Sequence, residues 1–106
     1  MMYTGEMKLV NEYLDLVRSG TKTQTVRYGI RNIQLGKLEL VDPKHDKNRV
    51  AVEVNEVSYL RYGNVDDDMA VSDGFKNKEE LTKALLKFYP DIDNESEVTV
   101  IKFSKS

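Results

Sequence analysis

The sequence predicts an α+β fold in which a small mixed β-barrel has helices packed at its side. Strand-like segments of alternating polarity are separated by turn residues, and few segments have the length of a helix that could cross over a sheet. Strands joined in this way favour a sheet that curls into a small barrel. The 106 residues contain no repeat and no linker, so we expect a single domain over residues 1–106.

The first half of the chain predicts one helix and two strands. A helix is expected from about Glu6 to Ser19, because apolar residues recur at helical spacing and Gly20 supplies a stop. These apolar residues are Met7, Val10, Leu14 and Val17. Residues 24–28 favour extended backbone, and residues 37–41 alternate as a strand does. The composition of residues 42–48 is that of a turn.

The second half predicts two strands around two helices. Valines at every second position from Val50 to Val54 indicate a half-buried strand, and a change of parity places a bulge near residues 55–57. Residues 64–71 suit a short helix capped by Asn64, with acidic residues in its first turn. A longer amphipathic helix begins after the cap Asn77 and ends at Pro90. Residues 97–104 form the last predicted strand.

Composition narrows the possible chemistry. The sequence has no cysteine, which excludes disulfides, thiolate metal sites and cysteine nucleophiles, and which suits a reducing compartment. It has no apolar run near the roughly 20 residues of a membrane span, and its first residues lack the pattern of a signal peptide. We therefore expect a cytoplasmic monomer that does not enter membranes and needs no cofactor or metal.

Charge is distributed unevenly along a chain whose net charge is −2. Residues 18–49 hold eight Lys or Arg against three acids, whereas residues 50–106 hold seven against twelve. This asymmetry suits a side of the molecule that attracts phosphate. Folding could equally interleave these charges into an ordinary mixed surface.

The segment GTKTQTVRYG, residues 20–29, places cations, hydroxyls and an amide where a buried strand would normally begin. One interpretation is a solvated edge strand, because threonine favours strands and lysine protects edges. The other is a polar cleft. A lysine in such a cleft can act as a nucleophile only if burial or a neighbouring cation keeps it neutral, and Arg27 is the local candidate cation.

The pattern Gly20-x-Lys22-Thr23-x-Thr25-x-Arg27 resembles the signature of ASCH domains, a family of small PUA-like β-barrels. Further features agree in order along nearly the whole chain. They are Gly36 before a strand, a strand with the letters VEV, Asp73-Gly74-Phe75 in an acid-rich turn, and an amphipathic helix that ends at Tyr89-Pro90. The resemblance therefore implies a PUA-like barrel.

The same resemblance implies two possible functions. ASCH domains are regarded as RNA-associated modules, which suggests that the chain binds RNA or a modified nucleoside or nucleotide. One bacterial branch instead hydrolyses N4-acetylcytidine, and its catalytic positions correspond to Lys22 as nucleophile, Thr25 as its assistant and Asp73 as proton carrier. That branch has glutamate where this chain has Asp73. The expected ligand contacts in either case are Thr23, Gln24, Arg27 and Tyr28.

Overall fold

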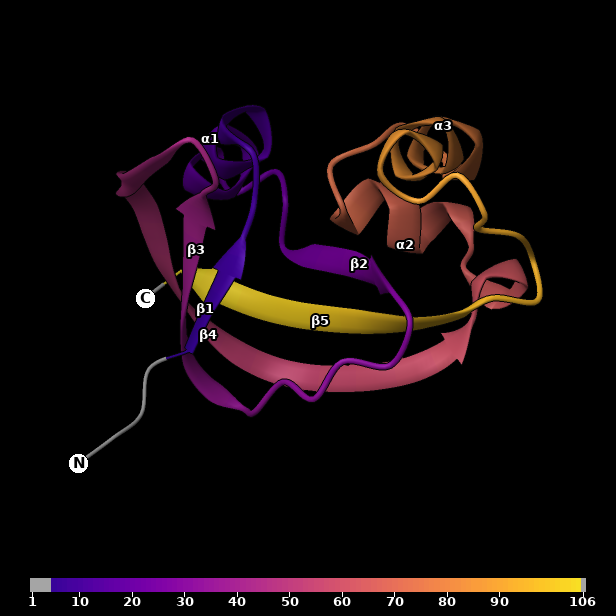
Figure 1. The fold of residues 1–106 in the computed structure, drawn as a ribbon, viewed down its shortest axis with the longest axis horizontal. Helices are drawn as coiled ribbons and strands as arrows, with labels where there is room; N and C mark the ends of the chain where they lie inside the picture. The colour runs from indigo at the N-terminus through magenta and orange to yellow at the C-terminus, as the bar shows by residue number, and fades with distance from the viewer. Residues whose placement is uncertain (1–4, 106) are drawn as a thin grey trace.

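The computed structural model describes residues 5–105, in which five strands form one mixed sheet with the order β1-β3-β4-β5-β2 (Figure 1). In chain order the elements are β1 (Gly5–Lys8), α1 (Asn11–Ser19), β2 (Gln24–Tyr28), β3 (Gly36–Asp42), β4 (His45–Arg61), a 3₁₀ helix η1 (Tyr62–Asn64), α2 (Asp67–Ser72), α3 (Lys78–Phe88) and β5 (Glu97–Lys105). The α+β class and the helices at the side of a curved sheet are confirmed.

The sheet mixes both strand directions and bends along its longest strands. β1 runs parallel to β3, and the other three strand pairs are antiparallel. The register between β4 and β5 shifts between Val54 and Glu56, which confirms the bulge predicted at residues 55–57. A bulge adds a residue to one strand and increases its local bend, so it helps β4 to curve as Figure 1 shows.

The start of the chain differs from the prediction. Residues 5–8 form β1 beside β3, and α1 begins only at Asn11, whereas the apolar spacing predicted one helix from Glu6. Met7 pairs with Leu40 and is buried, and the backbone N–H of Leu9 donates to the carbonyl of Val41 at 2.9 Å. A parallel partner far along the chain therefore overrides a local pattern that suits a helix. The predicted turn over residues 42–48 is also shorter, because β4 already begins at His45.

The middle helices are capped by side chains. Asp66, and not Asn64, caps the helix predicted at residues 64–71: its carboxylate accepts from the N–H of Met69 at 2.9 Å. Asn77 caps α3 as predicted, and its side-chain oxygen accepts from the N–H of Glu80 at 3.0 Å. The chain forms the 3₁₀ helix η1 up to Asn64 before it enters α2. The helix cap therefore lies at Asp66, two residues after the predicted cap.

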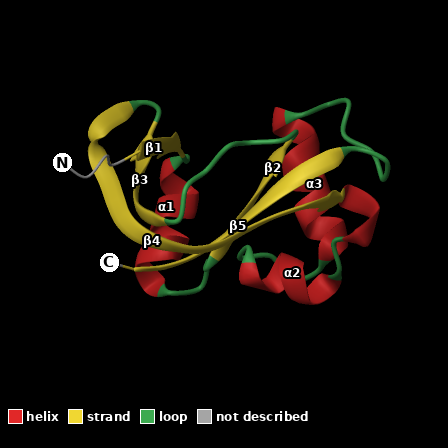
Figure 2. Ribbon diagram, turned by 90° about the horizontal axis from the view of Figure 1, so that it is seen from below, coloured by secondary structure: helices red, strands yellow, loops and turns green. Residues whose placement is uncertain are grey.

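Two hydrophobic clusters support the two ends of the sheet, and β5 contributes to both. The α1 cluster contains Met7, Leu9, Leu14, Val17, Leu38, Leu40, Val52, Val54, Ile101 and Phe103. The α3 cluster contains Val26, Tyr62, Val65, Ala70, Leu81, Leu85, Ile92, Val98 and Val100. Figure 2 shows α1 at one end of the long strands and α2 with α3 at the other. None of the helices within residues 5–105 has the length and apolar character that crossing a membrane requires.

Candidate functional site

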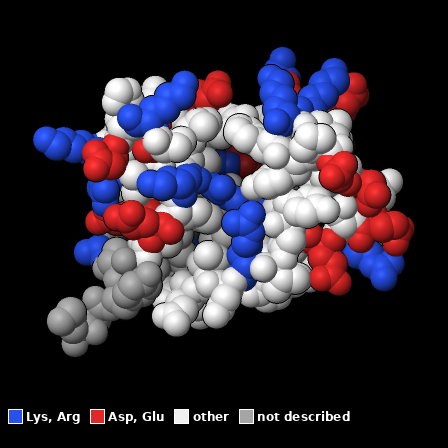
Figure 3. All heavy atoms as spheres, in the orientation of Figure 1, with Lys and Arg blue, Asp and Glu red and all other residues white. Residues whose placement is uncertain are grey.

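A pocket of about 250 Å³ lies between the two helical ends of the molecule. Figure 3 shows the hollow there, with basic and acidic atoms visible deep inside it. Residues from both clusters line it, together with polar side chains from β2 and from the turns beside it. The lining consists of Lys8, Leu9, Val10, Tyr13, Lys22, Thr25, Val26, Arg27, Pro43, Asp73, Phe75, Leu81, Ala84, Leu85, Phe88 and Tyr89.

Lys22 reaches this pocket because the turn after α1 is fixed on both sides. Gly20 adopts a φ of +84°, a left-handed conformation that glycine accepts without steric cost, and it ends the helix. The N–H of Lys22 then donates to Leu16, and the N–H of Thr23 donates to the carbonyl of Ser72. The Lys22 side chain turns inward and is only 2% exposed.

Asp73 meets Lys22 from the other side of the pocket. It follows α2 directly, and its N–H donates to the carbonyls of Met69 and Ala70. The ammonium of Lys22 donates to the Asp73 main-chain oxygen at 3.0 Å and also contacts the Asp73 carboxylate. Asp73 is 3% exposed, so the two charged groups form a buried pair. Within residues 5–105 the second carboxylate oxygen, Oδ2, has no hydrogen-bond partner.

Burial changes the proton affinity of both groups in this pair. Loss of hydration lowers the pKa of Lys22, the nearby Arg27 charge lowers it further, and Asp73 opposes the change. Loss of hydration raises the pKa of Asp73, and Lys22 opposes that change. Both shifts favour the neutral forms, so burial brings the proton affinities of the amine and the carboxylate closer together. A neutral amine beside a carboxylic acid is a combination suited to attack on a carbonyl group.

Thr25 and Arg27 project from β2 into the same pocket. They are two residues apart on a strand and therefore share a face. Arg27 donates from Nη2 to the main-chain oxygen of Lys8 at 2.7 Å, which ties β2 to the end of β1. The structure thus brings together the side chains of Lys22, Thr25, Arg27 and Asp73 around one pocket.

The other three residues expected to contact a ligand lie elsewhere. Gln24 is buried, and its side-chain amide donates to the main-chain oxygen of Met69 at 2.9 Å, a contact that supports α2. Thr23 is exposed, and Tyr28 stacks on Tyr89 with their ring centroids 5.4 Å apart. Thr23, Gln24 and Tyr28 do not line the pocket. Tyr28 is stacked on Tyr89, which does line it.

Aromatic side chains form a wall that the sequence analysis did not identify. The ring centroid of Tyr13 lies 5.7 Å from the ammonium of Lys22, and Tyr13 meets Phe75 edge-on at 5.9 Å. Burial raises the pKa of the Tyr13 hydroxyl, and the charges of Glu12 and Asp73 add to this shift. The available signal was the position of Tyr13 at the margin of the apolar face of α1, beside Leu14.

No group of three His, Asp or Glu side chains in the described part of the chain is arranged to hold a metal ion. The three consecutive acids Asp66, Asp67 and Asp68 serve the start of α2 instead, where Asp66 is the cap.

A curved mixed sheet with a polar pocket between two helical ends defines the PUA-like α+β class that the sequence resembles. The family model of the ASCH domain matches residues 1–105, and the chain therefore belongs to the ASCH domain family. No curated protein matches the chain significantly.

Solved structures agree with this fold. An ASCH domain from Lactobacillus crispatus superposes with a TM-score of 0.79 at 19% identity, over 96% of this chain and 79% of that one. A protein from Enterococcus faecalis gives 0.71 at 13% identity, over 100% and 77% of the two chains. A mutant of ZmASCH from Zymomonas mobilis gives 0.70 at 12% identity, over 94% and 66%. Identities this low establish the shared fold alone.

Proposed function

We propose that this protein binds a nucleoside, of which a modified cytidine is the best candidate, in the pocket around Lys22 and Asp73. One observation supports this most: a hollow of about 250 Å³ combines apolar and aromatic walls with a buried Lys–Asp pair. Small-molecule sites are largely apolar and contain a few placed polar groups, and their volumes begin at roughly 300 Å³. At about 250 Å³ the pocket lies slightly below this range, which suits a ligand no larger than one base with its sugar.

The chemistry of the polar groups also suits a nucleobase. A base presents hydrogen-bond donors and acceptors on one edge and an apolar face above and below. Lys22 and Asp73 supply a donor and an acceptor next to each other, and the Oδ2 atom of Asp73 has no partner within residues 5–105. Tyr13 and Phe75 supply aromatic surface beside them.

Isothermal titration with cytidine and N4-acetylcytidine tests this proposal. We expect saturable binding to the wild type and a loss of affinity in Thr25→Val, which removes a hydroxyl from the pocket without leaving a buried charge unpaired. Thr21→Val, a matched change at an exposed position, should bind as the wild type does. Absence of binding by both nucleosides would refute the proposal.

A polymer ligand makes a different prediction. If the pocket instead receives one nucleotide of an RNA strand, binding of a single-stranded oligonucleotide should weaken steeply as salt is added, because counterion release drives such binding. The net charge of −2 favours the small ligand, since surfaces that follow a phosphate backbone are usually strongly basic. A salt-independent response supports the nucleoside.

Hydrolysis of an amide is the second candidate function, and the burial of Lys22 against Asp73 favours it. In this scheme neutral Lys22 attacks the acetyl carbonyl of N4-acetylcytidine. Protonated Asp73 donates its proton to the departing N4 nitrogen, and the resulting carboxylate takes up the proton that the attacking amine loses. Water then hydrolyses the acetyl-lysine, which releases acetate and restores the amine. Asp73 is shorter than the glutamate of the hydrolase branch, but it already contacts Lys22 directly.

Hydrolysis is tested by incubating the protein with N4-acetylcytidine and measuring the release of acetate and cytidine by chromatography. Turnover should vanish in Lys22→Met and fall at least about a hundredfold in Asp73→Asn, since a positioned proton carrier contributes roughly 10²–10⁴-fold. Lys87→Met and Asp91→Asn make the same chemical changes at exposed positions and should leave turnover unchanged. If the wild type binds the nucleoside but does not hydrolyse it, hydrolysis is refuted and nucleoside binding remains as the proposed function.

A further inference from the structure

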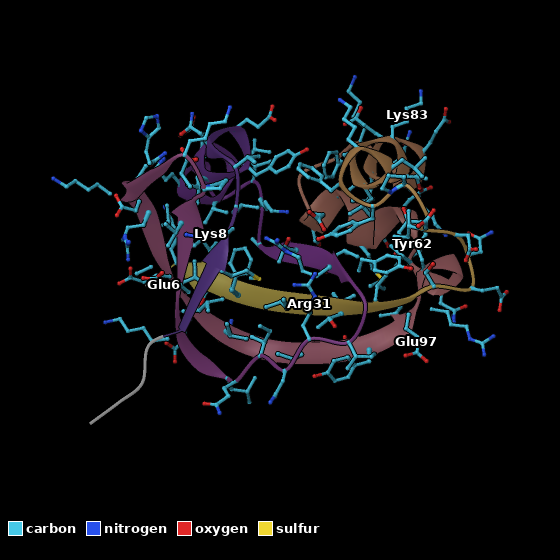
Figure 4. All side chains as sticks on the ribbon, in the orientation of Figure 1. Glu6, Lys8, Arg31, Tyr62, Lys83 and Glu97 are labelled. Carbon is cyan, nitrogen blue, oxygen red and sulfur yellow. The ribbon has the colours of Figure 1, made fainter. Side chains whose placement is uncertain are left out.

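Three cations surround the mouth of the pocket, and the proposed function does not use them all. Lys8 and Arg27 line the pocket, and Arg31 lies in the connection between β2 and β3. Figure 4 labels Lys8 beside β1 and β3 and Arg31 in front of β5, and Figure 3 shows basic side chains that adjoin at the lower edge of the hollow. We call Lys8, Arg27 and Arg31 the basic rim.

The basic rim differs from neighbouring cations because no acid neutralises it. In residues 5–105, no carboxylate lies within ion-pair distance of Lys8, Arg27 or Arg31. By contrast, Arg49 is shared by Glu6 and Glu39. The side chains of Arg27 and Arg31 donate to neutral main-chain oxygens, those of Lys8 and Tyr28, and Arg27 also has a side-chain hydrogen bond with Tyr89.

The positive charges of Arg27 and Arg31 are close enough to influence each other, and Arg27 also contacts the backbone of Lys8. Arg27 donates to the backbone of Lys8, and its pKa is lowered first by burial and also by the charge of Arg31. Tyr59 helps to hold this arrangement, since its hydroxyl donates to the main-chain oxygen of Arg31 at 2.9 Å. The N–H of Arg31 donates to Thr99 at 2.8 Å, so the loop that presents Arg31 is anchored on β5.

A doubly charged phosphate suits such a rim. Guanidinium groups offer parallel donors that match phosphate oxygens, and charge-assisted hydrogen bonds are stronger than neutral ones. Lys8 and Arg31 are exposed and Arg27 is half-buried, whereas the Lys22–Asp73 pair is almost fully buried in the pocket. We propose that the ligand is a nucleoside monophosphate, with its base beside Lys22 and Asp73 and its phosphate on Lys8, Arg27 and Arg31.

This inference rests on the proposed function and narrows its ligand class. A single nucleotide is favoured over an RNA strand because the basic area is confined to the mouth. Around it, acidic and basic side chains alternate over the surface in Figure 3, and no continuous basic track leads away from the hollow on that face.

Calorimetric titration of cytidine and cytidine 5′-monophosphate against the same protein tests the rim. We expect the monophosphate to bind about tenfold more tightly at low salt, and this advantage to shrink as sodium chloride rises from about 50 to 200 mM. The variant Lys8→Gln/Arg31→Gln should lose the advantage, so that cytidine and its monophosphate bind it with equal affinity. Both side chains are exposed, so this variant should fold.

The variant Lys37→Gln/Lys47→Gln is the control, because it removes two exposed positive charges that do not line the pocket. It should keep the full preference for the monophosphate. If the wild type binds cytidine and its monophosphate with equal affinity, the phosphate site is refuted and nucleoside binding still stands. If it binds neither, the proposed nucleoside-binding function is refuted as well. Tighter, steeply salt-dependent binding of a single-stranded RNA would assign the rim to a polymer and overturn the mononucleotide.

Discussion

Lys22 and Asp73 are both almost fully buried and form an ion pair, so the charge of each is compensated chiefly by the other. Removing one member of a buried ion pair leaves an uncompensated charge and costs roughly 3–5 kcal/mol. We expect Lys22→Met and Asp73→Asn each to lower the free energy of unfolding by about 3 kcal/mol, as measured by urea denaturation. The double variant should lose at least about 1 kcal/mol less than the sum of the two.

The proton affinities of the same pair predict how stability depends on pH. The raised folded-state pKa of Asp73 adds stability that is complete below its unfolded value of about 3.9 and is lost as pH rises through the folded pKa. The lowered pKa of Lys22 adds stability that is complete above about 10.4 and is lost as pH falls through the folded pKa. The ionised pair is therefore least favourable between these limits.

Comparing the wild type with Lys22→Met/Asp73→Asn at about pH 4.5, 7 and 9.5 measures this effect, because the double variant has neither titrating group. The free energy of unfolding of the wild type, relative to the double variant, should be lowest near pH 7 and should rise toward both extremes. A wild type that gains most near pH 7 would show that attraction within the pair outweighs its lost hydration.

At the scale of elements, the junction of α1 with α2 determines where Asp73 lies. Gly74 has a φ of +99°, and a Cβ at this position would lie 3.0 Å from the Cδ1 atom of Leu16 and 3.7 Å from the Cβ atom of Lys22. We expect Gly74→Ala to lower stability by about 2 kcal/mol and to weaken nucleoside binding, since the Asp73 carboxylate must shift.

Gly36→Ala is the matched control for this change. Gly36 also has a positive φ, +108°, but a Cβ there would meet nothing within 4 Å. It should lose about 1 kcal/mol from backbone strain and keep its affinity for the nucleoside. Thermal unfolding together with calorimetric titration separates the two effects. Equal loss of affinity in both variants would contradict the role assigned to the contact with Leu16.

Elements with strong local signals were predictable from the sequence, whereas elements that depend on distant partners were not. The Gly20 stop, the strand at residues 24–28 and the Asn77 cap each follow from local chemistry, and the structure confirms them. Strand β1 was missed because only its pairing with β3 distinguishes it from a helical turn. Asp66 replaced Asn64 as cap because η1 displaces the start of α2.

The site divides in the same way. Thr25 and Arg27 share a strand face, so their proximity was predictable from alternation. Lys22 lies in a turn, where alternation does not apply, and its partner Asp73 is 51 residues away. The choice of Asp73 therefore came from the family resemblance. Gln24 was misleading because a polar residue near a pocket can instead bond a neighbouring helix, as its contact with Met69 shows.

At the scale of the whole molecule, the pocket is placed where the α1 cluster and the α3 cluster meet. Its walls take Leu9 and Tyr13 from one end, and Leu81 and Leu85 from the other. Only the sheet beneath, chiefly β5, belongs to both clusters. A ligand that fills the pocket therefore contacts both clusters and adds to the Lys22–Asp73 and Tyr13–Phe75 contacts that already join the two ends.

This bridging predicts a pattern of amide hydrogen exchange. At a nucleoside concentration about 100 times its dissociation constant, global stability should increase by about 2.7 kcal/mol. Exchange should slow in both α1 and α3, whose side chains line opposite walls, and should change least at residues 45–47, the exposed start of β4, which does not line the pocket. The Lys22→Met/Asp73→Asn variant at the same nucleoside concentration is the control and should show no slowing. Protection confined to one helix would mean that the ligand rests on a single wall, and the bridging role of the pocket would have to be abandoned.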